Sequence, residues 1–198
     1  MRGRLRVVLL AATLAGCAFG PAADPPLTSS LLDAVPADVP HRAASSLTLV
    51  VFPPEARPAI DTTQMAYAMK VHQLAYYARN QWAETPPEML QPLLVRTLEA
   101  TGAFHAVVAP PGAAASGLAL RTDIAELVQD FTQDPPVLRL ALRVRLNDER
   151  TRTVLGTREI VVTETMAQKG AEAGVAAANV AVAKALRMVA QFVIDKTP

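Results

Sequence analysis

The stretch YYARNQWAETPPEMLQPLLVRTLEATGAFHAVV, from Tyr76 to Val108, contains a strand–turn–helix–strand pattern. The helix is expected to begin at Pro86-Pro87, because a proline N–H in the first turn would have no helical partner. Thr85 and Glu88 have the spacing of a capping box, and Gly102 is expected to end the helix. Between these ends, apolar residues at helical spacing predict one buried face: Met89, Leu90, Leu93, Leu94 and Leu98.

Strands are predicted on the N-terminal side of this helix. Residues 46–52 (SLTLVVF) are apolar and β-branched and stop at a double proline, which predicts a buried strand. The period-two pattern of residues 65–77 predicts a hairpin that turns near Lys70–Gln73, although its Ala and Met content leaves a helix open. Trp82 is expected to be a core anchor rather than a ligand platform.

The clearest strand pattern lies in residues 137–146, where apolar residues alternate with arginines. The apolar side comprises Leu138, Leu140, Leu142, Val144 and Leu146. The polar side comprises Arg139, Arg143 and Arg145. Residues 153–166 are expected to supply an antiparallel partner, and residues 118–131 a less regular strand with a bulge near Leu127. A last helix is expected from about Ala171 to Ile194.

These elements predict an α+β fold: a single two-layer domain with a mostly antiparallel sheet and two main helices packed on it. The chain has 198 residues, of which 51% are hydrophobic, which is enough for one domain with a core. The 19 Lys and Arg residues nearly balance 18 Asp and Glu residues, and a net charge of +1 gives no reason to expect a nucleic-acid partner.

The first 17 residues have the pattern of a lipoprotein signal peptide. A basic start is followed by an apolar run, Val7–Ala15, which is too short to cross a bilayer because a spanning helix needs about 20 residues. Leu14–Cys17 resembles the bacterial lipobox, in which the cysteine receives the lipid and becomes the first mature residue. Cys17 is the only cysteine, so no intramolecular disulfide can form. An ordinary signal peptide with an incidental cysteine is the alternative.

We therefore expect a signal peptide in residues 1–16, a lipidated Cys17 with a proline-rich tether in residues 17–45, and the folded domain in residues 46–198. Within the tether, Ser30–Leu32 could add a strand at a sheet edge. Acyl chains (palmitate) contribute roughly 0.8 kcal/mol per buried methylene, so more than one chain gives a stable anchor. Ala18 is not the aspartate that retains lipoproteins in the inner membrane of enteric bacteria. In a cell with two membranes, the lipobox resemblance therefore favours the periplasmic face of the outer one.

No later segment is expected to be long enough to cross a membrane, and the C-terminal helix carries Lys184 and Arg187.

No pattern of catalytic, cofactor-binding or metal-binding residues stands out. The three histidines lack metal-ligand spacing, and no phosphate-cradling loop or nucleophile elbow occurs. Four carboxylates near the 118–131 strand fit a solvated edge better than acid–base catalysis. They are Asp123, Glu126, Asp130 and Asp134. We therefore expect no enzymatic activity, no cofactor and no metal.

Two features could form interfaces. Arg139, Arg143 and Arg145 are either a solvated sheet face or a surface for a partner or a lipid headgroup, since guanidinium groups suit carboxylates and phosphates. Gly170 and Gly174 at the start of the last helix indicate either close packing on the sheet or a subunit contact, so a homo-oligomer stays open.

The assembled pattern resembles one protein family, the auxiliary lipoprotein component of ABC-type transport systems (PqiC-like lipoproteins). The resemblance covers about 150 residues, and its specific part is the run Trp-x-x-x-Pro-Pro-x-Met-Leu that starts at Trp82. The matching residues are Leu14–Cys17, Pro53-Pro54, Ile60-Asp61, Met65–Tyr67, Tyr76-Tyr77, Asn80–Ala83, Pro86-Pro87, Met89-Leu90, Leu98 and Gly102–Phe104. Residues Met65–Ala68 depart from the aliphatic-Val-Tyr-Arg run usual in the family, so a turn arginine is absent.

The resemblance implies a non-enzymatic periplasmic lipoprotein. Its partners would be ABC transporter subunits and an MCE-type (mammalian-cell-entry) substrate-binding protein, which move lipids or other hydrophobic molecules between membranes. An envelope scaffold or activator lipoprotein that binds a peptidoglycan-synthesis or secretion partner is the alternative, because a long tether suits it equally well.

Overall fold

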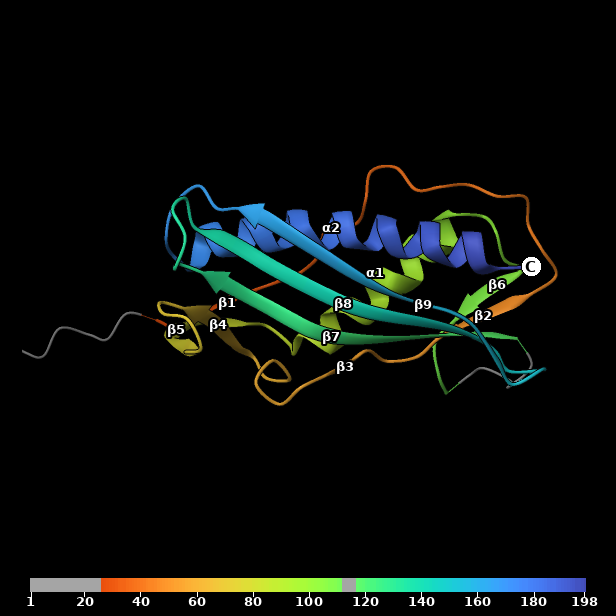
Figure 1. The fold of residues 1–198 in the computed structure, drawn as a ribbon, viewed down its shortest axis with the longest axis horizontal. Coiled ribbons are helices and arrows are strands. Elements are labelled where there is room, and N and C mark those ends of the chain that lie inside the picture. The colour runs from red at the N-terminus through yellow and green to blue at the C-terminus, as the bar shows by residue number, and fades with distance from the viewer. Residues whose placement is uncertain (1–25, 112–116) are drawn as a thin grey trace, which may run out of the picture.

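The computed structural model describes residues 26–111 and 117–198, in which two helices cover one face of a nine-stranded sheet (Figure 1). In chain order the elements are β1 (Thr28–Ser30), β2 (Thr48–Val51), β3 (Glu55–Ala56), β4 (Gln64–Ala68), β5 (Ala75–Trp82), α1 (Pro86–Ala100), β6 (Ala106–Val108), β7 (Leu118–Asp130), β8 (Val137–Asp148), β9 (Thr153–Thr165) and α2 (Ala171–Lys196). The prediction of one α+β domain with two main helices is confirmed.

The sheet is organised around β7, which has different partners along its two edges. On one edge β8 pairs with it antiparallel, and β9 pairs antiparallel with β8. On the other edge β2, β3 and β4 follow one another, and each runs parallel to β7. Beyond them, β6 is parallel to β2, and β1 is parallel to β5.

The prediction of a mostly antiparallel sheet is therefore wrong, because the sheet contains both parallel and antiparallel strand pairs. The chain advances along β7 through β2, β3 and β4 in one direction instead of turning back after each strand. Residue alternation indicates which face of a sheet a side chain occupies, but it does not indicate the direction of the neighbouring strand.

The long antiparallel unit formed by β7, β8 and β9 has the predicted alternation. The apolar residues of β8 at positions 138, 140, 142, 144 and 146 are buried, whereas Arg143 and Arg145 are exposed. The register of β7 against β8 shifts between Ile124 and Glu126, close to the bulge expected at Leu127.

Helix α1 has the predicted ends and buried face. The N–H and the hydroxyl of Thr85 both donate to a carboxylate oxygen of Glu88, at 2.9 and 2.8 Å. Just past the helix, Gly102 has a φ of 64°, a left-handed conformation that favours glycine. The five predicted apolar residues are all buried, and Trp82 is buried in the same core.

Helix α2 packs across β8 and β9 and contacts α1 (Figure 1). Its length and composition alone would allow it to cross a membrane, so the expectation that no later segment is long enough was wrong. More than half of the apolar stretch is buried inside the protein, as expected for the core helix of a folded domain.

The chain before β2 lies against the domain from Thr28 onward. Strand β1 pairs with β5 from Thr28 to Ser30, so the edge strand expected at Ser30–Leu32 begins two residues earlier. Farther on, the side chain of Asn179 on α2 accepts hydrogen bonds from the N–H groups of Asp33 and Ala34. Residues 28–45, expected in the tether, therefore contact the domain within the described chain.

Candidate membrane and partner surfaces

The predicted lipidation site, Cys17, lies outside the described residues. The described chain begins at Pro26, beside β1, at the end of the molecule that also carries β4 and β5 (Figure 1). Pro26 is nine residues beyond Cys17, and an extended chain of that length spans about 30 Å at most. This end of the domain would therefore lie close to a membrane that held the lipid.

The sheet face opposite the helices carries the three predicted arginines, and their surroundings differ. Arg139 is held by carboxylates of β7: it pairs with Glu126, and its Nη1 lies 3.2 Å from Oδ2 of Asp130. Two of the carboxylates that the sequence assigned to a solvated edge are thus joined to one of the candidate arginines. The charge of Arg139 is therefore already paired within the domain.

Asp130 is nearly buried at the centre of this cluster. Burial on its own would raise the pKa of Asp130. The hydroxyl and the N–H of Thr132 donate hydrogen bonds to it, and together with the charge of Arg139 they outweigh burial, so the pKa is lowered. The carboxylate is therefore kept ionised, which fits a structural ion pair rather than a proton donor.

Within the described chain, Arg143 and Arg145 lie on the same face without such carboxylate partners. Arg143 lies in register between Asp123 on β7 and Glu159 on β9. Arg145 lies opposite Arg121 on β7, so two like charges face each other across adjacent strands. In the part of the chain that the structure describes, neither Arg143 nor Arg145 has an ion pair or a side-chain hydrogen bond.

Arg121 extends this patch and was not identified as a candidate from the sequence. Its guanidinium carbon lies 4.0 Å from the centroid of the Phe52 ring, a cation–π contact that holds the side chain against the sheet. Its position opposite Arg145 depends on the register of two strands, for which the sequence carries no local signal. We refer to Arg121, Arg143 and Arg145 as the arginine patch.

A shallow cavity of about 420 Å³ lies between β9 and α2. Residues Val161, Val162, Thr163, Lys184, Arg187 and Met188 line it. Its two cations already have partners, since Lys184 pairs with Glu164 and Arg187 pairs with Asp38 at 2.8 Å. The cavity thus offers little unpaired charge to a ligand.

Metal-binding side chains are dispersed in the described residues. Among these residues, no three His, Cys, Asp or Glu side chains are grouped so that they could hold a metal ion. Burial, and to a lesser extent neighbouring Tyr67, raises the pKa of Tyr77 to about 12. The Tyr77 hydroxyl donates to Oε1 of Gln129 at 2.8 Å, which identifies it as a structural group.

The described molecule is thus a small α+β domain whose open sheet face carries the arginine patch. Residues 30–190 match the family model of the ABC-type transport auxiliary lipoprotein component, and the chain belongs to this family. Membership supports a location in the cell envelope and an accessory role in transport.

Solved structures share the fold. A protein of Xanthomonas campestris is 21% identical with a TM-score of 0.74, and the match covers 86% of this chain and 95% of that one. An uncharacterised protein is 14% identical with a TM-score of 0.71, covering 85% and 99%. A hypothetical protein of Chlamydia trachomatis is 9% identical with a TM-score of 0.55, covering 75% and 96%. A search of curated proteins gives no match.

Proposed function

We propose that this protein is a non-enzymatic accessory lipoprotein of an ABC transporter. A lipid on Cys17 would hold it at the periplasmic face of the outer membrane. There it would work with an MCE-type substrate-binding protein that moves lipids or other hydrophobic molecules between membranes. The observation that carries this proposal is the family match over residues 30–190.

The N-terminal pattern supports the anchor. A basic start, a short apolar run and small residues precede the only cysteine of the chain. Strand β1 begins at Thr28, so ten residues separate it from Cys17 along the chain. The proposal therefore places the domain next to the membrane rather than far from it.

The arginine patch supports a protein partner on the open sheet face. Unpaired guanidinium groups on an uncovered sheet face suit carboxylates of another subunit. Like charges opposite each other on neighbouring strands are destabilising, and an acidic partner would relieve the repulsion between Arg121 and Arg145. We propose that a transporter or MCE-type subunit docks here.

A Cys17→Ser change tests the anchor. The domain is expected to stay folded, because the described core lies beyond residue 26, and to bind membranes much more weakly, because the acyl chains are missing. Membrane fractionation with circular dichroism of the purified protein measures both effects. Mass spectrometry of the wild-type protein is the direct readout of the anchor, and an unacylated cysteine would contradict lipidation at Cys17.

Capture of partners from membranes in mild detergent tests the transport role. The lipidated protein is expected to recover an MCE-type protein or permease subunit, and a variant with Arg143→Glu and Arg145→Glu should recover much less. Failure to recover either subunit counts against the proposal. Recovery of peptidoglycan-synthesis or secretion proteins instead would favour an envelope scaffold.

A further inference from the structure

The tip of the β4–β5 hairpin exposes an unusual share of apolar surface. Its side chains Met69, Val71 and Leu74 are 55%, 70% and 39% exposed. They represent three of the eight large hydrophobic residues that are exposed in the described chain, and they lie within six consecutive positions. A clustered apolar patch, unlike scattered exposed residues, indicates a contact with another molecule or with a membrane.

The base of the hairpin is held firmly, so the tip projects from a rigid support. Tyr67 and Ala68 on β4 pair with Gln129 and Asp130 on β7. The Tyr67 ring packs against Tyr77, with centroids 4.7 Å apart. The tip residues are therefore presented outward by a fixed strand pair and do not reach back to the core.

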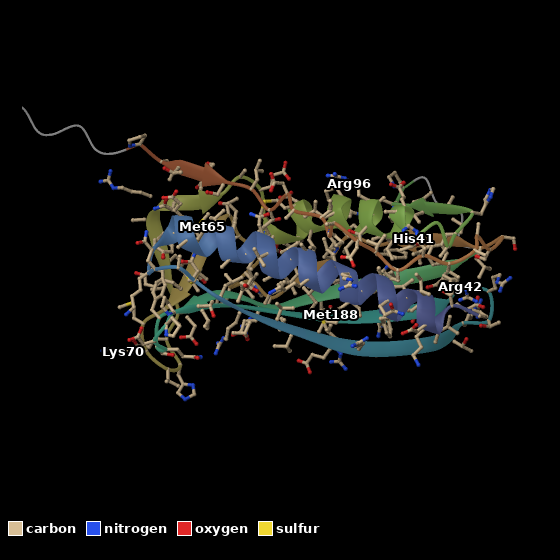
Figure 2. The ribbon with its side chains drawn as sticks, turned by 90° about the horizontal axis from the view of Figure 1, so that it is seen from above. His41, Arg42, Met65, Lys70, Arg96 and Met188 are labelled. Carbon is tan, nitrogen blue, oxygen red and sulfur yellow. The ribbon has the colours of Figure 1, made fainter. Side chains whose placement is uncertain are left out.

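The tip lies at the end of the molecule where the described chain begins. In Figure 2 Lys70 lies at one end, whereas His41 and Arg42 lie toward the other. Thr28 on β1 pairs with Asn80 on β5, eight residues beyond His72, so the two sites are separated by roughly 26 Å or less. A membrane within reach of Cys17 would also be within reach of the tip.

The charge of the hairpin suits an anionic lipid surface, and the hairpin offers no carboxylate to a basic partner. Residues 62–83 contain no Asp or Glu, and the tip itself carries Lys70 and His72 between its apolar side chains. Apolar side chains interleaved with a basic residue are typical of segments that enter the headgroup region of a bilayer, where the cation reaches lipid phosphates.

We propose that the tip of the β4–β5 hairpin inserts into the headgroup region of the membrane that holds the lipid anchor. Met69, Val71 and Leu74 bury their apolar atoms at the interface, and Lys70 contacts lipid phosphates. Two contacts at one end direct the rest of the long axis away from the bilayer, which leaves the arginine patch accessible to a partner. This inference rests on the proposed anchor for its geometry only.

The test uses the full mature chain with Cys17→Ser. Because this variant cannot carry the lipid, the result does not depend on whether Cys17 is lipidated in the wild type. Because Cys17 is the only cysteine, this variant is cysteine-free, and a single new cysteine can be labelled. Val71→Cys carries an environment-sensitive fluorophore at the tip. The matched control is Val154→Cys, which labels a similarly exposed valine at the start of β9, 60% exposed against 70% for Val71. Vesicles of phosphatidylethanolamine with phosphatidylglycerol provide the membrane.

When vesicles are added, we expect the emission of the fluorophore at position 71 to shift to the blue and that of the fluorophore at position 154 to stay unchanged. Replacing Met69, Val71 and Leu74 together by serine should lower partition into vesicles at least about tenfold, because their apolar surface is lost. Val154→Ser with Val161→Ser should leave partition unchanged. An unshifted label at position 71 overturns the proposal. A shift that depends on protein concentration without vesicles also overturns it, in favour of a second copy of the chain.

Discussion

The two faces of β8 have the same backbone but opposite surroundings. On the covered face Leu138, Leu142 and Leu146 are at most 1% exposed and pack beneath the helices. On the open face Arg143 and Arg145 are exposed and have no partner among the described residues. The comparison separates two tasks, since the covered face contributes most of the stability and the open face is free to bind.

Leu142→Ala tests the covered face and should have the largest effect. We expect a loss of about 2–5 kcal/mol in the free energy of unfolding, because a fully buried leucine leaves a cavity. Denaturant unfolding followed by circular dichroism measures it. The control is Val161→Ala on β9, where the side chain is 58% exposed and the change should be small. Equal effects of the two substitutions would contradict the assignment of the faces.

Asp130→Asn tests the ion-pair cluster where the open face is partly buried. We expect a loss of about 1–2 kcal/mol at neutral pH, because hydrogen bonds and an ion pair to a charged carboxylate are weakened. Denaturant midpoints at neutral and acid pH measure it. Glu99→Gln, on the exposed surface of α1, is the control and should change little.

The acid dependence of this effect has a definite sign. The pKa of Asp130 is lower in the folded state than its ordinary value near 3.9, so the ionised group stabilises the fold above about pH 4. That stabilisation is lost as the pH falls through the lowered folded pKa. The difference between the wild type and Asp130→Asn should therefore shrink in acid. A difference that stays constant down to strongly acid pH contradicts this account.

The sequence predicted those features that depend on nearby residues. The ends of α1, the alternation of β8 and the hairpin at Lys70–Gln73 follow from caps, turns and periodicity over a few residues. The close packing of α2 on the sheet, one of the two alternatives for Gly174, is also observed, although it involves a residue far along the chain: a Cβ there would lie 2.0 Å from the side chain of Gln129.

Features that depend on distant pairing could not be predicted. The parallel pairing of β2, β3 and β4 with β7 does not change the alternation of apolar and polar residues, so the alternation could not indicate it. The same holds for the position of Arg121 opposite Arg145, which requires the register of two strands. The contact of residues 28–45 with the domain depends on single side chains such as Arg42, which donates to the carbonyl of Thr197, within a composition typical of linkers.

Arg145→Glu tests the open face and should have the smallest effect on stability. We expect the free energy of unfolding to rise by a few tenths of a kcal/mol, because repulsion from Arg121 becomes attraction across the strands. Capture of an acidic partner should fall at the same time, so stability and binding move in opposite directions. Arg158→Glu, on the other side of the sheet in β9, is the control and should leave capture unchanged. A loss of stability together with intact capture would show that Arg145 stabilises the fold and does not bind the partner. The assignment of binding to the open face of β8 would then be wrong.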